Sequence, residues 1–363
     1  MIWIYISESL LYLCFSLLMG SFIIQFIPER LKPEIRISKR LIQLSVLGVV
    51  FFSVAPVIRV ILFLYEDIGF ELTMQNVLGF EVGKAWNVTV ILAIFFYLFV
   101  SLFPVLKSKV LSGISLFFTF ILLLALGWAS HAASLTEWSG FVFHSLHFLA
   151  VTIWVGILLV VGWCSKNQEN WLAYLRWFTP LAIVCFLTIA GTGLFLMNLV
   201  IDVNEYGDAW TVPYGQALLV KHLSIIPVLF FAFINGFWIR RRLKRQVNIN
   251  PIPWMRYESI LLFFTFVSTA VLGQQEPPHS IEITLGGSGP SAIFDYFYTG
   301  IIEPSMSLQF GLNTINILFF IVAIIFMWLI VYSFKKRASA VLPFFMSMFC
   351  ILSLYFGLMA SIQ

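Results

Sequence analysis

Charged residues are scarce in this sequence. They make up 10% of its 363 residues, whereas a soluble domain carries roughly a quarter. Hydrophobic residues make up 61%, and apolar runs of about twenty residues, enough to cross a hydrocarbon core of about 30 Å, recur along the chain. The composition therefore excludes an ordinary soluble domain and predicts a protein solvated by lipid.

Several functional motifs are also missing. There is no Walker loop and no Asp-Lys-Thr-Gly-Thr sequence, so we expect no ATP hydrolysis. The Lys/Arg clusters adjoin apolar spans rather than forming a nucleic-acid platform. No nucleophile–base–acid set is present, and we expect no enzymatic activity. The N-terminus lacks the basic segment of a cleavable signal peptide, so we predict that it forms the first helix.

Cysteines are few and unpaired in sequence: Cys14, Cys164, Cys185 and Cys350 include no CxxC pair. A disulfide framework and a thiolate metal clip are therefore not indicated. All four lie within or at the ends of apolar runs, which is typical of small apolar packing residues.

The apolar runs predict an all-α, polytopic membrane helix bundle of about ten transmembrane helices. We place them at 3–27, 41–65, 84–106, 110–131, 140–163, 175–201, 212–239, 256–275, 310–334 and 339–361.

Charge sign alternates between the loops. Most basic residues fall in loops 1–2, 3–4, 5–6, 7–8 and 9–10, whereas the intervening loops are acidic. By the positive-inside rule the basic side is cytoplasmic and both termini face outward. Three basic residues lie outside these basic loops: Arg59 near the outer end of span two, Lys84 at the start of span three, and Lys221, about 13 Å into span seven.

One long loop joins spans eight and nine, from about Gln275 to Gln309. Residues 281–285 alternate weakly like a strand, and the aromatic patch formed by Phe294, Tyr296, Phe297 and Tyr298 is typical of a packed lid. We divide the chain into helices 1–3 (1–109), a histidine-bearing core (110–280), an extracytoplasmic loop (281–309) and two C-terminal helices (310–363).

All five histidines fall on the outer side of this topology. His144 and His147 share one helical face because they are three residues apart. His131 ends the preceding span, so these three imidazoles are predicted to converge on one metal ion. A purely structural role for an HxxH pair remains open.

Three further side chains are weaker metal-binding candidates. His222, next to Lys221, is either a deeper ligand or a histidine bonded to a neighbouring helix. His279, in the long loop, either caps the site or is simply solvated. Met197 offers a thioether, and thioether with imidazole favours copper over hard ions, although most membrane methionines only pack.

At these residues the chain resembles the copper resistance protein D (CopD) family of bacterial membrane proteins. The motifs are Trp128-Ala-Ser-His131-Ala, His147-Phe-Leu-Ala-Val-Thr-Ile-Trp154-Val-Gly156, and Tyr214-Gly215 with Leu218, Leu219 and Lys221. Asn235 before Arg240-Arg241-Arg242, and Pro277-Pro278, fit as well. The resemblance covers about 110–280.

The resemblance implies a multi-pass protein of the bacterial cytoplasmic membrane that binds copper (Cu⁺ or Cu²⁺) and moves it across the bilayer, often inward. Family members commonly work with a CopC-like extracytoplasmic copper-binding protein, and this chain carries no such β-domain itself. His131 and His147 are the first candidates for ligands, then His144, with His222 and His279 behind them.

Two other functions remain open. The histidines could supply a bis-imidazole haem site for electron transfer, but no histidine is available for a second haem on the inner side. Alternatively, the chain could be a subunit that delivers copper or assembles a partner without transporting the ion.

Overall fold

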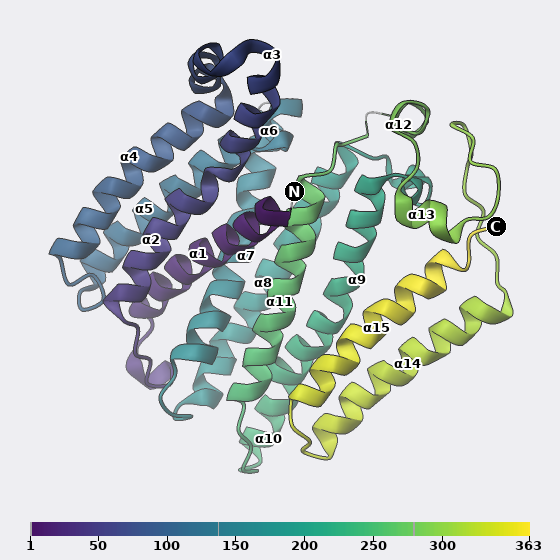
Figure 1. Ribbon diagram of the computed structural model, residues 1–363. Helices are drawn as coiled ribbons and strands as arrows, with labels where there is room; N and C mark the ends of the chain where they lie inside the picture. The colour runs from purple at the N-terminus through teal and green to yellow at the C-terminus, as the bar shows by residue number, and fades with distance from the viewer. Residues whose placement is uncertain (1, 137, 279) are drawn as a thin grey trace. The chain divides into compact units, whose positions relative to one another are not determined.

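The fold is almost entirely helical (Figure 1). The computed structural model describes residues 2–136, 138–278 and 280–363, with the backbone alone for His131. Within these ranges no β-strand forms, and two isolated bridges are the only β pairing. Because lipid cannot hydrogen-bond a peptide group, a spanning segment satisfies its backbone internally as a helix. The predicted all-α polytopic fold is confirmed.

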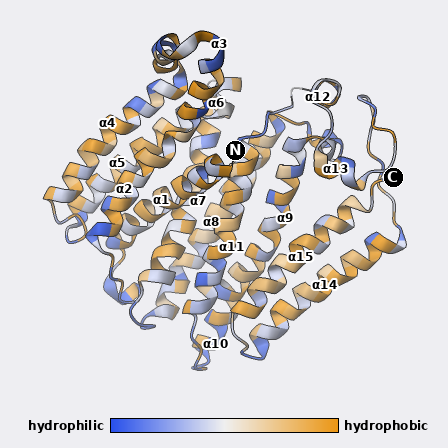
Figure 2. Ribbon diagram, viewed as in Figure 1, coloured by the Kyte–Doolittle hydropathy of each residue, from blue (hydrophilic) through white to orange (hydrophobic). Residues whose placement is uncertain are grey.

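Ten segments of the described chain are long and apolar enough to span a membrane, and apolar residues dominate them (Figure 2). They are α1 (Ile2–Phe26), α2 with α3 (Lys39–Ser53, Ala55–Gly79), α4 (Glu81–Leu102), α5 (Lys109–Trp128), α7 (Trp138–Cys164), α8 (Trp171–Asn198), α9 continued by α10 (Pro213–Phe233, Arg240–Lys244), α11 (Ile252–Gly273), α14 (Thr314–Lys335) and α15 (Val341–Met359).

Shorter elements connect these spans. They are α6 (His131–Thr136), α12 (Ile281–Ser288), α13 (Ala292–Phe297), three 3₁₀ turns (Glu29–Leu31, Val203–Glu205, Asp208–Thr211) and a π-helical turn between α9 and α10 (Ile234–Ile239).

The chain forms two compact units, Met1–Leu196 and Met197–Gln363. The boundary falls inside the predicted histidine-bearing segment 110–280, whose helices therefore contribute to both units. The four-part division of the chain stays a prediction.

In the first unit, α1 packs against α2, α5 and α7. Its contact with α7 is very close at Gly20 and Gly156, where a Cβ on either residue would overlap the backbone of the other helix. Small residues at such crossings let two backbones approach, which is how membrane helices gain van der Waals contact. Around this crossing lies a core that includes Phe15, Leu18 and Phe22, all fully buried.

In the second unit, α9 packs against α11 and α15, and α14 and α15 form a helical hairpin. Two apolar clusters cover the outer part of α9, one around Trp210, Leu219 and Phe294, the other around Met197 and Leu218. The outer segment is fastened to this unit by Asp208, whose carboxylate accepts hydrogen bonds from the Leu308 N–H (2.6 Å) and the Ser307 hydroxyl (3.2 Å).

Basic loops meet at one end of each unit, as the charge alternation requires. In the first unit, loop 1–2 is bound to loop 5–6 by two backbone hydrogen bonds, Arg36 N to Cys164 O (3.0 Å) and Lys166 N to Glu34 O (2.8 Å). In the second, the Arg242 guanidinium donates to the Lys335 carbonyl (3.3 Å) and lies 4.3 Å from the centre of the Phe334 ring. The assignment of this end to the cytoplasm stays a prediction.

Two local predictions were wrong. Residues 281–285 are not a strand but the start of α12, because Ser280 caps the helix by accepting from Ile283 N; five alternating residues are too few to distinguish the two periods. The acidic segment after span two is also helical: α3 continues to Gly79 across a break at Gly69, where φ is 75°.

The aromatic patch of the long loop divides between core and surface. Phe294 is fully buried and stacks on Tyr298 with ring centres 5.2 Å apart, whereas Tyr296 is 81% exposed. Only part of the predicted lid therefore packs against the helices.

We expect Gly156→Ala to lower the stability of the protein, because the new methyl group would overlap the Ser16 carbonyl and force α1 and α7 apart. Overpacking of this kind costs about 1–3 kcal/mol. The measurement is the thermal unfolding midpoint in detergent.

The matched control is Gly191→Ala in α8, where no atom lies within 4 Å of the added Cβ. There the better helix propensity of alanine should leave the midpoint unchanged or raise it. Equal midpoints for wild type and both variants would contradict the close α1–α7 contact.

Candidate metal-binding site

His147 is the best-defined candidate ligand of the first unit. It lies in the outer half of α7 and is partly buried. Its Nδ1 is 3.0 Å from the hydroxyl of Thr192 on α8, and its ring lies against Gly193, where an added Cβ would come within 3.3 Å of His147 Cε1. The Thr192-Gly193 pair therefore both binds the imidazole and gives it room.

The hydrogen bonds of Thr192 fix the direction of this contact. Its hydroxyl lies 2.6 Å from the Thr188 carbonyl, which can only accept. Because a hydroxyl has one hydrogen to donate, Thr192 Oγ1 then accepts from His147 Nδ1–H. The ring nitrogen Nε2 consequently carries the lone pair, and a neutral imidazole in this form is a metal ligand.

The predicted convergence of His131, His144 and His147 stays a prediction. His144 is partly buried on α7, one turn before His147. The side chain of His131 lies outside the described residues, as does all of His279. Among the side chains that are described, no three His, Cys, Asp or Glu groups are gathered closely enough to hold a metal ion.

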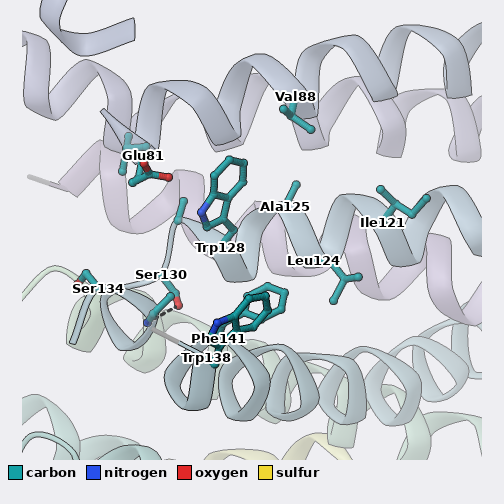
Figure 3. Close-up of a pocket in the computed structure, with 13 residues that line it drawn as sticks. Glu81, Val88, Ile121, Leu124, Ala125, Trp128, Ser130, Ser134, Trp138 and Phe141 are labelled. Atoms are coloured by element: carbon teal, nitrogen blue, oxygen red, sulfur yellow. Dashed lines mark hydrogen bonds between the residues drawn. The ribbon is translucent and has the colours of Figure 1, made fainter. Parts of the chain in front are cut away.

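The segment before His131 borders a cavity of about 710 Å³ in the first unit (Figure 3). Trp128, Ala129 and Ser130 line it, with Glu81 and Trp138 among the other lining residues. Most of the lining is apolar, and Trp138 is 76% exposed. Exposed tryptophans near the end of a span are typical of the membrane interface. Because its lining is mostly apolar, the cavity suits an apolar occupant better than a metal ion.

His222 is the candidate ligand of the second unit. It lies in the outer half of α9, and its Nδ1 is 2.7 Å from the Tyr206 hydroxyl. Tyr206 comes from the connection that precedes α9, just before the 3₁₀ turn Asp208–Thr211. A histidine that binds metal through one nitrogen is usually held through the other, and Tyr206 provides such a support.

Tyr206 also lies against two apolar clusters that include methionine side chains. It packs against both apolar clusters around α9, one of which contains Met197 and the other Met306. Met197 is buried, so its thioether is a packing group here, and its predicted role as a ligand stays untested.

Lys221 takes part in no ion pair among the described residues. Asp202 is exposed and caps the turn at Val203–Glu205 by accepting from Asn204 N, and Glu137 is outside the described residues. The ion pairs found in the described residues are three: Lys32–Glu29, Arg36–Glu34 and Lys84–Glu81. The last explains how Lys84 is accommodated at the start of its span.

The structure adds two buried carboxylates that the sequence analysis missed. Glu8 in α1 and Glu258 in α11 are 8% and 2% exposed. The useful signal was their position: each lies about two turns inside an apolar span, and an ionisable residue at such a depth is a functional candidate.

The family comparison bears on the second half of the candidate region. Residues 172–272 match the family described as copper resistance protein D, CopD. The segment 172–272 belongs to the CopD family. It runs from α8 through α9 to α11 and contains Thr192, Met197, Tyr206, His222, Asn235 and Glu258. No curated protein and no solved structure matches the chain.

The predicted CopD resemblance is confirmed over this segment. With ten membrane-capable helices in the described chain, it also confirms the prediction of a multi-pass protein of the bacterial cytoplasmic membrane. The match links this segment to a family of copper-handling membrane proteins. His131, His144 and His147 lie outside the matched residues.

We expect the stabilising effect of Tyr206 to disappear at high pH. Burial raises the pKa of Tyr206 to about 12, above its ordinary value of about 10. The neutral phenol is therefore favoured in the folded state, and this contribution is complete below about pH 10 and is lost towards about pH 12.

The measurement is the unfolding midpoint of wild type and Tyr206→Phe from about pH 8 to about pH 11, either side of the ordinary tyrosine pKa. Other tyrosines cancel in the comparison. The difference between the two proteins should shrink as pH rises, and a constant difference would contradict the burial of Tyr206.

Proposed function

We propose that this protein binds copper at the outer ends of its helices and moves it inward across the cytoplasmic membrane, acting as a permease without its own energy source. The observation that carries the proposal is the His147–Thr192 hydrogen bond. It places the lone pair of His147 on Nε2, and it involves a hydroxyl of the CopD segment. His131 and His144 are the proposed co-ligands, and His279 is proposed to cap the site.

Copper suits the chemistry of these side chains. Imidazole binds copper in both oxidation states, and thioethers favour Cu⁺. The five histidines all belong to the predicted outer side, whereas carboxylates are not grouped for a hard cation among the described residues. Met197 would serve as a soft ligand only if its thioether turned out of the apolar cluster.

His222 is proposed as a deeper ligand in the second unit. Copper binding at Nε2 requires the tautomer in which Nδ1–H donates to Tyr206, so Tyr206 would select the binding form of the ring. Lys221 precedes His222, and its charge would oppose copper there unless the long side chain extends towards the outer interface.

The proposal includes a CopC-like extracytoplasmic copper-binding protein as the donor of copper. The segment 281–309 is the proposed docking region, because α12 and α13 belong to the loop that the topology predicts to be outside. We propose no nucleotide as an energy source.

We expect wild-type protein purified in detergent to bind copper in stoichiometric amount, and His131→Ala/His147→Ala to lose it. Thr192→Val should weaken copper affinity by about 10-fold or more, because loss of a supporting hydrogen bond typically costs 10–100-fold. The measurement is copper per protein by elemental analysis, with the visible spectrum of the same samples.

Thr179→Val is the matched control, since Thr179 is a buried threonine of the same helix without a hydrogen-bond partner for its hydroxyl in the described chain. Its affinity should equal that of wild type. Copper-free protein with a Soret band would replace the proposal with haem binding. Protein with neither signal would favour a partner subunit that does not bind copper itself.

For transport, we expect His222→Ala to slow copper uptake into liposomes by about 10-fold or more while copper bound at the outer histidines is retained. Uptake is followed with a copper-sensitive dye inside the liposomes. Unchanged uptake in His222→Ala would remove this residue from the path. A wild-type protein that binds copper but takes none up would support a delivery role instead.

A further inference from the structure

A second polar site lies in the inner half of the second unit. Glu258 on α11 is 2% exposed, and one of its carboxylate oxygens, Oε2, accepts a hydrogen bond from Asn235 Nδ2 at 2.6 Å. Glu258 is about 9 Å along α11 from its start at Ile252, the end that carries the basic loops. This pair is therefore far from the outer histidines along the helix.

Asn235 is presented to Glu258 by an irregular backbone. It lies in the π-helical turn Ile234–Ile239, which continues α9. A π-helical turn inserts an extra residue into the helix, and such turns often occur at functional sites. Asn235 is itself 5% exposed, and its Oδ1 is a buried acceptor without a hydrogen-bond partner in the described chain.

Among the described residues, Glu258 takes part in none of the ion pairs, and its carboxylate is bonded to the Asn235 amide alone. The titratable groups on the elements packed near this part of α11 are Tyr214, Lys221, His222, Arg240, Arg241 and Arg242 on α9 and its continuation, Tyr332 and Lys335 on α14, Cys350 and Tyr355 on α15, and Arg256 and Tyr257 on α11 itself. A lone ionised carboxylate in a membrane core is costly.

Two acceptor oxygens, Glu258 Oε1 and Asn235 Oδ1, thus have no donor of their own in the described chain. A proton on Glu258 removes the charge and supplies the missing donor. With the amide of Asn235 turned over, the Glu258 Oε2–H group donates to Asn235 Oδ1 in place of the Nδ2–H donation to Oε2, so the assignment of amide O and N at this contact depends on the protonation state.

The same two helices carry polar groups between this pair and His222. The Ser224 hydroxyl on α9 lies 3.1 Å from the Thr265 hydroxyl on α11. His222 and Asn235 are thirteen residues apart on α9 and its continuation, which is about 20 Å. Polar groups therefore contact α11 at two depths, Ser224 with Thr265 and Asn235 with Glu258, while His222 lies close to the first of them on α9.

We propose that Glu258 and Asn235 form a proton-binding site, and that its proton is exchanged for copper as the ion passes along α9 and α11. The exchange breaks the carboxylic O–H bond, both electrons of the bond remain on the carboxylate oxygen, and the proton passes to water. The copper cation then neutralises the carboxylate, and no oxidation or reduction is involved. The exchange rests on the proposed function, whereas the proton site does not.

The proton site is tested on the full-length protein by infrared spectroscopy. Wild type near neutral pH should show the C=O stretch of a protonated, buried carboxylic acid. Glu258→Gln should lose this band, and Asn235→Leu should shift it. Glu303→Gln, at an exposed carboxylate of the same unit, should keep it unchanged.

Absence of the band from wild type overturns the proton site, and so does its survival in Glu258→Gln. If Glu258→Gln fails to fold, the shift in Asn235→Leu decides the assignment. A band that neither disappears nor shifts in any folded variant counts against the site.

The exchange is tested by adding copper to weakly buffered wild-type protein with a pH indicator dye. Release of a proton with loss of the carboxylic band, both absent in Glu258→Gln, supports it. Copper bound without loss of the band overturns the exchange and leaves the proton site and the outer copper site standing. A wild type that binds no copper overturns the proposed function and the exchange together, while the infrared band still decides the proton site.

Discussion

The bilayer offers no hydrogen bonds, and the rest of this structure depends on that constraint. Most backbone groups within a span are satisfied by their own helix, with exceptions such as the prolines at Pro180 and Pro227, and most polar side chains follow the same rule. Many Ser and Thr hydroxyls of the spans donate to a carbonyl one turn earlier in the same helix, as Thr89, Thr119 and Ser347 do. Against that background, a polar group bonded across helices is a departure that needs a reason.

Three such departures support the proposed function, and each joins two segments of one unit. Thr192 positions His147, Tyr206 positions His222, and Asn235 contacts Glu258. The first two hold imidazoles through Nδ1 at the predicted outer side, and the third holds a carboxylate near the opposite end. In the proposed path, imidazole nitrogens at the outer side and oxygen ligands near the opposite end would offer a copper ion different ligand types.

Much of the fold could be predicted from sequence, because hydropathy and charge sign report directly on lipid contact and topology. The spans, the helical class and the meeting of the basic loops at one end of each unit follow from them. The continuation of α3 past Tyr65 and the start of α12 at Ile281 could not be predicted, since both depend on local capping and packing rather than on periodicity. Glu258 was visible in the sequence as an isolated acid, but its partner Asn235 is 23 residues away and lies in a π-helical turn, which periodicity does not predict.

The hairpin of α14 and α15 is attached to the second unit at both ends. Arg242 holds the Lys335 carbonyl at the basic end, and Asp208 holds Leu308 just before the hairpin at the outer end. Both anchors lie in segments that the ribosome makes much earlier than the hairpin. Arg242 and Asp208 are thus synthesised before the residues that they bind. They are without these two hydrogen-bond partners until the last two helices enter the bilayer. We therefore expect the hairpin to dock late in biogenesis, and a protein truncated before it would lack the packing of α15 against α9.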